Sequence, residues 1–423
     1  MNIAFLGIVF VAFVTAAWRQ LQWVGDEMSP MASLSKTVTD SAAGAVELAL
    51  GLIGVMTLFL GLMKVAEAGG LLRILAGLIR PIMVRLFPEV PPRHPAMGAM
   101  ILNLSANAMG LGNAATPFGI RAMQELNKIN PHQGTATDSM ALFLAINTSS
   151  ITLLPTGVIA LRASIGSSDP AGILPTTLFA TLCSTVVAVI AAKVYGRFFR
   201  PKLGEVEPCR VEESRDETSE DFGGASPLWV SLSVMGLLLA MIPLAVIYGK
   251  TLSPWIIPCL IAGFLAFGVL RRVKVYEVFV EGAKEGFQVA VRIIPYLVAI
   301  LVAVAMFRAS GALDYVVEVL GPWTGRVGLP AEALPMALIR PLSGSGAYGI
   351  LASILQDPSV GPDSYTGYLV STLQGSTETT FYVLAVYFGA VQVRRIRHTL
   401  AAALTADFFA VIASIVACTY LFR

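Results

Sequence analysis

Apolar stretches of membrane-spanning length recur along the whole chain. They fall at about residues 2–18, 45–66, 96–118, 139–163, 173–195, 227–249, 252–270, 287–307, 332–355, 365–390 and 399–421. Each is close to the roughly 20 residues that an α-helix needs to cross the hydrocarbon core. Because helices satisfy their own backbone hydrogen bonds in lipid, the pattern predicts an all-α integral membrane protein. The first stretch lacks a basic leader and a small-residue cleavage pattern, so we expect a retained helix rather than a signal peptide.

Four of these stretches carry polar residues and helix breakers at their centres. The four polar patches lie at residues 103–117, 147–155, 340–349 and 374–382. An unpaired polar group in hydrocarbon costs several kcal/mol, so these groups must face protein or water. We therefore predict broken helices around a substrate site. The candidate substrate-binding residues are Asn103, Ser105, Asn107, Asn113, Asn147, Thr148, Ser149, Arg340, Ser343, Ser345, Gln374, Ser376, Thr377, Glu378 and Thr379. For the second patch, helix capping and gluing by Ser and Thr is the alternative.

The chain repeats itself. Three blocks align in the same order: 44–71 with 286–313, 104–107 with 342–345, and 147–150 with 374–377. The only extended hydrophilic stretch lies between them and is too polar to fold on its own. We therefore expect two homologous membrane halves, 1–196 and 227–423, joined by a cytoplasmic linker at 197–226. Internal duplication of this kind is typical of transporter scaffolds.

The basic residues predict how the halves are oriented. Clusters at 73–93, 193–202, 271–274 and 394–397 should all lie inside the cell, because Lys and Arg concentrate in cytoplasmic loops. If every apolar stretch crossed, these clusters could not share one side. We expect 96–118 and 332–355 to enter and turn back as re-entrant hairpins, which leaves about nine spans plus two re-entrant segments. The two halves then form an inverted repeat.

Glu378 is the sharpest candidate for chemistry, because an intramembrane carboxyl is a functional-site hypothesis by default. On a continuous helix, Ser371, Gln374, Glu378 and Tyr382 would share one face. Two roles stay open: a structural ion pair with Arg340, or coupling of transport to protons or sodium. Five other charges sit toward segment ends, where snorkelling to the headgroups explains most of them: Glu47, Lys64, Glu67, Arg292 and Asp407.

The third patch, Arg340 to Gly349, alternates Gly and Ser. Consecutive backbone N–H groups in such a segment can converge into an anion-binding concavity at a helix start. The patch lacks the Gly-Lys-Ser/Thr ending of a phosphate loop, so a nucleotide-hydrolysing protein is not expected.

Composition excludes other classes. The chain is 56% hydrophobic and 13% charged, against about 25% charged in soluble domains. A net charge of +2 gives no footprint for nucleic acid. The four cysteines have no CxxC spacing and the three histidines lie near segment ends. We therefore expect no metal site, no cofactor and no catalytic residues, and the protein should not be an enzyme.

The patches resemble known families. Residues 103–107 and 112–117 are similar to spore maturation protein A, and residues 340–346, 361–364 and 374–382 to spore maturation protein B. The chain thus resembles a fusion of the two. The resemblance implies membership of the nucleoside recognition, or Gate domain, group, which includes parts of concentrative nucleoside transporters and of ferrous-iron transporter B. In that group it implies paired, oppositely oriented modules; the substrate does not carry over.

Together these features predict a multi-pass transporter or permease of the cell (inner or cytoplasmic) membrane. Its partners would be the lipid bilayer and a small polar or anionic solute, nucleoside-like only by analogy, with Glu378 as the candidate coupling residue. A non-transporting scaffold or regulator of cell-envelope or spore maturation is the alternative. Homo-oligomerisation is left open by the sequence.

Reporter fusions test the predicted topology. A reporter fused after Lys128 should be active inside the cell, and one fused after Pro358 should be active outside. Two reporters on the same side would rule out the re-entrant hairpins.

Overall fold

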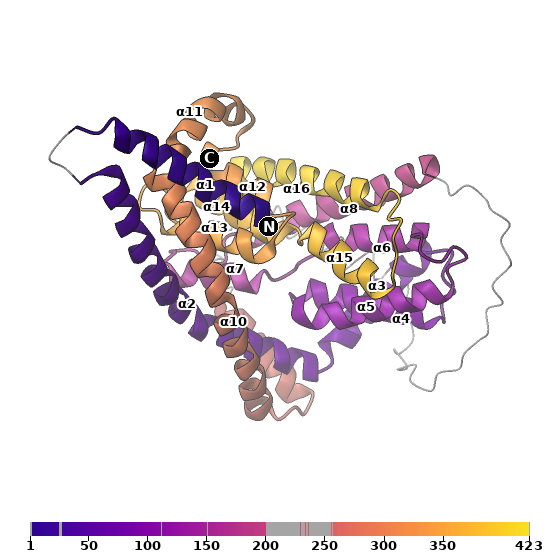
Figure 1. Cartoon of the computed structure of the whole chain (residues 1–423). Helices are drawn as coiled ribbons and strands as arrows, with labels where there is room; N and C mark the ends of the chain where they lie inside the picture. The colour runs from indigo at the N-terminus through magenta and orange to yellow at the C-terminus, as the bar shows by residue number, and fades with distance from the viewer. Residues whose placement is uncertain are drawn as a thin grey trace.

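The computed structural model describes residues 2–24, 28–110, 112–149, 151–199 and 257–422, with isolated positions at 229, 233, 236 and 255. The described part is helical apart from one isolated bridge between Thr135 and Arg395 (Figure 1). Of the predicted linker at 197–226, residues 197 and 198 belong to the end of a helix, and residues 200–226 lie outside the described residues, as does nearly all of the stretch 227–249. From the next apolar stretch, a helix over Ile257–Leu270 is described.

The helices follow the same order in both halves. The first half has α1 (Asn2–Leu21), α2 (Pro30–Ala68), α3 (Leu71–Leu86), α4 (Pro95–Ala108), α5 (Gly112–Lys128), α6 (Asp138–Ser149), α7 (Thr156–Ser164) and α8 (Leu174–Phe198). The second has α10 (Val275–Ala309), α11 (Ala312–Thr324), two 3-10 turns, η1 (Gly325–Val327) and η2 (Ala331–Ala333), then α12 (Leu334–Ile339), α13 (Gly344–Gln356), α14 (Tyr365–Ser376), α15 (Thr380–Ala390) and α16 (Thr399–Phe422). The predicted interruptions are confirmed, because each polar patch separates two helices.

Corresponding long helices of the two halves lie antiparallel. Along α2 and α10, Gly286 lies against Met56 and Thr57, and Gly282 lies against Leu60 and Lys64. The register runs in opposite directions, and the missing side chains let the two backbones approach closely. In α8 and α16, the Ser184 hydroxyl donates to the Ala406 carbonyl at 3.1 Å, while Gly196 lies against His398.

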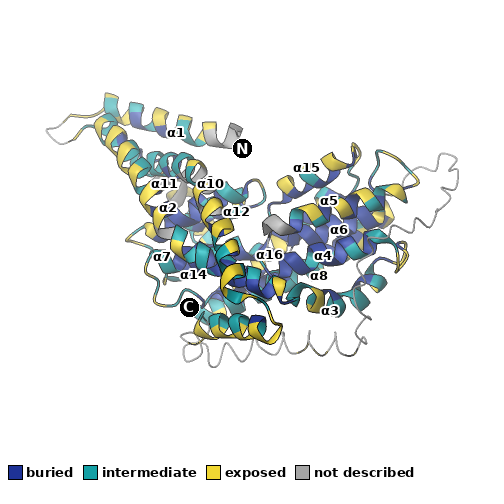
Figure 2. Cartoon of the chain, turned by 90° about the horizontal axis from the view of Figure 1, so that it is seen from below, coloured by how far each residue is buried: buried dark blue, intermediate teal, exposed yellow. Residues whose placement is uncertain are grey.

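Among the described residues, two large hydrophobic cores form, and each draws on both halves (Figure 2). The first core joins α3, α4, α5 and α6 to α15, with Phe143 fully buried in it and Leu384 contributed by the second half. The second core joins α13 and α14 to α2 and α7, with Leu369 fully buried in it and Ile159 contributed by the first half. The short helices α7 and α15 are therefore exchanged between the halves.

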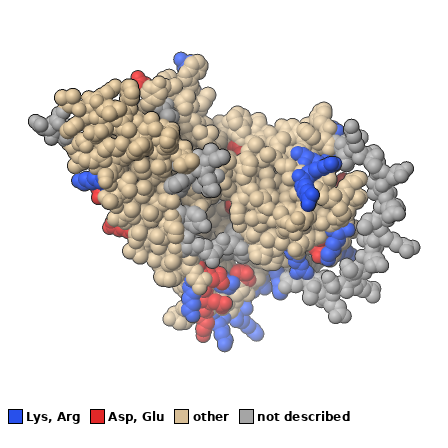
Figure 3. Space-filling view, viewed as in Figure 1, with Lys and Arg blue, Asp and Glu red and all other residues tan. Residues whose placement is uncertain are grey.

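The outer surface suits lipid. On α16, Phe408, Ile412 and Val416 are exposed at helical spacing, while Asp407 on the same helix is buried. Within the described residues, α2, α8 and α16 are long and apolar enough to cross a membrane. On the face drawn in Figure 3, charged atoms gather mainly at the lower edge and in one basic patch to the right, and most of the other described surface is uncharged.

An ion pair between a buried arginine and a partly exposed aspartate joins the two halves at one end of α7. Arg162, near the end of α7, is 0% exposed and lies 3.1 Å from the Asp363 carboxylate, just before α14. The guanidinium also donates to the Pro362 carbonyl at 2.6 Å and stacks on the ring of Tyr368. Ser168 donates to the same carboxylate through its backbone N–H at 2.7 Å. Here the first half supplies the arginine and the second half supplies the aspartate.

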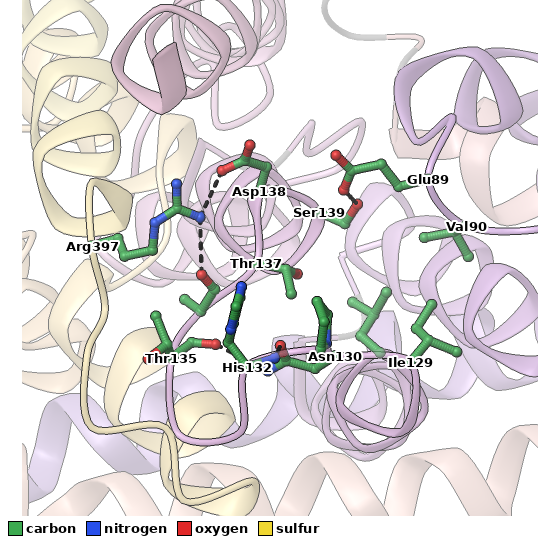
Figure 4. A pocket seen from close by; sticks show the side chains of 13 residues that line it. Glu89, Val90, Ile129, Asn130, His132, Thr135, Thr137, Asp138, Ser139 and Arg397 are labelled. Atoms are coloured by element: carbon green, nitrogen blue, oxygen red, sulfur yellow. Dashed lines mark hydrogen bonds and ion pairs between the residues drawn. The ribbon is translucent and has the colours of Figure 1, made fainter. Parts of the chain in front are cut away.

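A second ion pair has the reverse arrangement: the second half supplies the arginine and the first half supplies the aspartate. Arg397, after α15, lies 2.7 Å from Asp138, the first residue of α6 (Figure 4). The same guanidinium donates to the carbonyls of Ala136 and Phe199. Asp138 is 52% exposed at its side chain, and a cavity of about 330 Å³ opens beside the pair. Because α6 and α7 lead from Asp138 through a break to Arg162, the two ion pairs sit on opposite sides of that break.

The two ion pairs should differ in their contribution to stability. Asp363→Asn removes the paired counter-charge of a buried guanidinium, with Asp169 as a second acidic group nearby, and should lower the free energy of unfolding by about 1–3 kcal/mol. Asp138→Asn should cost about 0–1 kcal/mol, because its carboxylate is half exposed. Thermal unfolding of the purified full chain in detergent measures both, and equal losses would contradict the assigned asymmetry.

The Arg162 end should also weaken in acid. Burial raises the pKa of Asp363, but hydrogen bonds from Ser167 and Ser168 and the charge of Arg162 outweigh burial and lower the pKa overall. A lowered folded-state pKa gives stability that is present above the unfolded value of about 3.9 and is lost as the pH falls through the folded value. This acid-dependent loss below about pH 4 should be absent in Asp363→Asn.

Candidate functional site

The four breaks meet in space, and their backbones pair with one another. The Glu378 N–H donates to the Thr148 carbonyl at 2.8 Å, and the Leu153 N–H donates to the Ala108 carbonyl at 2.9 Å. The Phe381 N–H donates to the Pro341 carbonyl at 3.1 Å. Each bond joins a different pair of breaks. Backbone groups released where one helix ends are thus satisfied by another break, as a low-dielectric interior demands.

A cavity of about 230 Å³ lies where the breaks meet. All four breaks contribute to its wall, which is made of Asn107, Gly110, Thr152, Leu154, Pro155, Thr156, Gly157, Val158, Arg340, Gly344, Tyr348, Gln374, Gly375, Thr377, Glu378 and Thr379. Six of these residues are among those predicted from the sequence: Asn107, Arg340, Gln374, Thr377, Glu378 and Thr379. The wall combines amide, hydroxyl and charged groups with a few apolar side chains.

Arg340 is the buried positive charge of the cavity. It follows the last turn of α12 and is 7% exposed. Its guanidinium donates to the Thr379 hydroxyl at 3.1 Å and to the Thr377 carbonyl, while its Nε has no protein partner in the described part of the chain. Arg340 interacts electrostatically with Glu378 and Asp407. Among the described residues it forms no ion pair with Glu378, so the alternative of a structural ion pair is not what the fold adopts.

Glu378 lies in the break itself, and the predicted helical stripe is wrong. Helix α14 ends at Ser376, and Thr377 is extended, with φ −139° and ψ 164°. Ser371 and Tyr382 therefore belong to different helices; Ser371 is fully buried, whereas Tyr382 is 56% exposed. Glu378 and Gln374 still reach the cavity together. The helix stops because the backbone of Glu378 pairs with Thr148 in the other half, a long-range bond that local periodicity does not reveal.

The asparagines of the first two patches tie breaks together. The Asn107 amide donates to the Asn147 side-chain oxygen at 3.0 Å, and the Asn147 amide donates to the Phe143 carbonyl. Asn103 donates to the Ala115 carbonyl at 2.8 Å and to the Tyr387 hydroxyl at 3.2 Å. Of these asparagines, only Asn107 lines the cavity.

Several predicted hydroxyl residues bond to their own helices. The hydroxyls of Ser105, Thr148, Ser149 and Ser376 donate to carbonyls three or four residues earlier, which is the gluing and capping use of Ser and Thr. None of the four lines the cavity. The side chain of Asn113 lies outside the described residues, so its predicted role stays a prediction.

The third patch caps its own helix. The Ser343 hydroxyl accepts a hydrogen bond from the Gly346 N–H at 3.0 Å and lies 3.5 Å from the Ser345 hydroxyl. That N–H is therefore not free for an anion. Gly344 has a different use, because a Cβ there would lie 2.7 Å from the Thr379 hydroxyl. Its missing side chain lets the third and fourth patches approach.

Sequence reasoning missed four polar residues at or near the site. Thr152, Thr156 and Tyr348 line the cavity, and the Tyr348 hydroxyl donates to the Gly157 carbonyl at 3.0 Å. Asp407 was expected near a segment end, but it is 6% exposed and accepts a hydrogen bond from Thr380 at 2.6 Å. The signal for Asp407 was its position inside an uninterrupted apolar stretch, which the neighbouring basic cluster obscured.

The groups of the cavity wall are able to bind a small polar solute reversibly. Within the described ranges, no three His, Cys, Asp or Glu side chains gather around a point that could hold a metal ion. The cavity offers a cation, a carboxyl, amides and hydroxyls in one place. These groups can orient a small polar molecule through hydrogen bonds and charge.

Paired modules of broken helices around a polar cavity define a class of multi-pass membrane protein. The family described as nucleoside recognition, or Gate, matches residues 49–165 and 290–394. These two ranges contain the four breaks. The chain belongs to this family.

Relatives with curated names match the two halves separately. The chain is 50% identical over 171 residues to spore maturation protein B of Bacillus subtilis, covering 40% of this chain and 95% of that protein. It is 46% identical over 171 residues to spore maturation protein A of the same organism, covering 40% of this chain and 87% of that protein. Both matches are consistent with a fused A and B protein. Inner membrane protein YjiG of Escherichia coli is 33% identical over 84 residues, covering 20% of this chain and 55% of that protein.

Solved structures give a weaker likeness. CNTnw in an inward-facing, substrate-bound state has a TM-score of 0.39 and 14% identity, covering 97% of this chain and 90% of that one. A CNTnw variant in an outward-facing state has a TM-score of 0.40 and 14% identity, covering 98% and 91%. These scores are too low to support any inference about this chain.

Close approach of two breaks should make Gly110 irreplaceable. Gly110 has φ +78°, and a Cβ there would lie 2.5 Å from the Leu154 carbonyl oxygen. Gly134 has nearly the same φ, +76°, with nothing within 4 Å. Gly134→Ala should cost only the left-handed strain of about 1–2 kcal/mol. Gly110→Ala should cost clearly more, because the backbone must also shift. Thermal unfolding measures both, and equal losses would show that the breaks are not in tight contact.

Proposed function

We propose that this protein is a transporter or permease for a small polar or anionic solute. The observation that carries the proposal is the cavity at the junction of all four breaks, which holds Arg340 and Glu378. Buried charge inside a membrane protein is costly and is expected on a solute or ion pathway. Discontinuous helices that meet at mid-depth are the arrangement in which many transporters bind substrate.

The size and chemistry of the cavity limit the substrate. A volume of about 230 Å³ is below the roughly 300–1,000 Å³ of pockets that hold drug-sized ligands. Arg340 favours an anionic group, while Gln374 and Thr377 suit hydroxyl or amide groups. A nucleoside-like solute is supported only by the family description.

We also propose a topology for this function. The antiparallel packing of α2 with α10 and of α8 with α16 supports an inverted repeat of two halves, 1–196 and 227–423, with a cytoplasmic linker at 197–226. About nine segments would cross the membrane, with re-entrant hairpins formed by α4–α5 and α12–α13. In both hairpins a short turn joins two helices, which supports a segment that enters and returns.

A second candidate is a non-transporting scaffold or regulator of cell-envelope or spore maturation. The names of the two Bacillus relatives favour it. A scaffold requires no solute in the cavity. Uptake of radiolabelled uridine and of phosphate into liposomes, together with thermal stabilisation by either solute, separates the two candidates. Neither uptake nor stabilisation by these two solutes would favour the scaffold.

Glu378 should couple transport to a cation. Glu378→Gln keeps the shape of the side chain but removes the charge, so uptake should fall roughly tenfold and lose its dependence on pH or sodium. Proteoliposome uptake across a pH gradient and across a sodium gradient measures both effects.

Glu318→Gln is the matched control, because Glu318 is an exposed carboxyl on α11 in the same half. It should leave uptake unchanged. Full uptake with unaltered pH dependence in Glu378→Gln would exclude coupling through this residue.

A further inference from the structure

Asp407 is a buried carboxyl that the proposed transport site does not yet use. It lies in the ninth position of α16, far from either end of that helix, and is 6% exposed. One carboxylate oxygen accepts a hydrogen bond from the Thr380 hydroxyl at 2.6 Å. The other oxygen is buried without a protein partner in the described structure. One neutral donor is far less than an ionised carboxylate needs when it is removed from water.

Thr380 connects this carboxyl to the cavity. The preceding residue, Thr379, lines the cavity and accepts a hydrogen bond from Arg340. Arg340 interacts electrostatically with both Glu378 and Asp407. One guanidinium thus interacts electrostatically with two carboxyls, Glu378 in the fourth break and Asp407 on α16. If both carboxyls are ionised, one negative charge stays uncompensated inside the protein.

We propose that Asp407 is a proton-binding site that sets the position of Arg340. In the conformation described, the carboxyl carries the proton as a new O–H bond, and the guanidinium is free to bond the carbonyl of Thr377 and the hydroxyl of Thr379. When the proton leaves to water, the carboxylate attracts the guanidinium. Arg340 then releases one or both of these bonds, and the wall of the cavity changes.

A proton fits this site better than a metal ion. Within the described residues, the Thr380 hydroxyl is the one hydrogen-bond partner of Asp407, whereas Na⁺ or another hard cation needs several oxygen ligands. The positive charge of Arg340 also repels a metal ion. A proton requires no further ligand, and it neutralises the one uncompensated charge.

Other titratable groups surround α16, but none acts on Asp407 as Arg340 does. The helices packed against α16 carry Cys183, Lys193, Tyr195 and Arg197 on α8, Asp138 on α6, Tyr365 and Tyr368 on α14, and Tyr382 and Tyr387 on α15. Among the described residues, Arg340 is the one charged group with an electrostatic effect on Asp407, and Thr380 is its hydrogen-bond donor. A pH response that depends on Asp407 can therefore be traced to these three residues.

Only the effect of Asp407 on transport rests on the proposed function. Proton binding itself can therefore be tested without measuring uptake. Infrared difference spectroscopy of the purified full chain, between acid and alkaline pH, should show a protonated carboxyl band that is lost as the pH rises. Asp407→Asn should abolish this band and remove the part of the pH dependence of thermal unfolding that follows the band, while the acid-dependent loss assigned to Asp363 remains. Asp138→Asn, the same change at a half-exposed carboxylate, should retain both signals.

A second variant keeps the proposal falsifiable if Asp407→Asn fails to fold. Thr380→Val keeps the side-chain shape but removes the donor that stabilises the ionised carboxylate. The midpoint of the infrared transition should then move up by about one pH unit or more, as expected for one hydrogen bond to a charged oxygen. A band that persists in Asp407→Asn, an unmoved midpoint in Thr380→Val, or a transition set by sodium at fixed pH would overturn the proposal. If the protein shows the infrared band and its expected shift but no uptake, the result would contradict the proposed transport and not the proton site at Asp407.

Discussion

The rest of this structure depends on one constraint: the backbone hydrogen bonds that a helix loses where it breaks inside a membrane must be replaced. Lipid cannot replace those bonds, so each released N–H and C=O needs a protein partner. Here the partners come from other breaks: Glu378 pairs with Thr148, Leu153 with Ala108, and Phe381 with Pro341. Four interruptions that would each be costly alone become mutually satisfied. Their meeting point is also the place where polar side chains can gather around a cavity.

This requirement explains why the two halves are interleaved. For the breaks to meet, α7 must cross to the second core and α15 must cross to the first. At their outer ends, each crossing is fixed by an arginine of one half and an aspartate of the other. The crossing helices make apolar contacts with the opposite core, and the ion pairs fix which ends lie together. The cavity thus lies between two well-packed bodies rather than inside either of them.

Much of this could be predicted from the sequence, because the relevant signals were local. Asn, Gly, Ser and Pro at the centres of apolar stretches predicted the breaks, and the repeated blocks predicted the matching order of helices. Helix ends were less accessible: α2 begins at Pro30 rather than near residue 45, because its first turns are polar and leave the apolar stretch. The side-chain stripe through Glu378 failed because the break is fixed by a partner in the other half. The burial of Asp407 next to the site was missed for a similar reason, because its environment depends on Thr380 and Arg340, which lie far from it in the sequence.

The exchange of α7 and α15 has a consequence for how such a protein comes into being. Neither half forms a complete core alone, because α7 of the first half packs in the second core and α15 of the second half packs in the first core. The halves therefore need each other in equal numbers more than they need a covalent link. If the polypeptide were divided between residues 200 and 226, the two pieces would still have to assemble as an obligate pair. A single chain guarantees that one-to-one supply at the moment of synthesis.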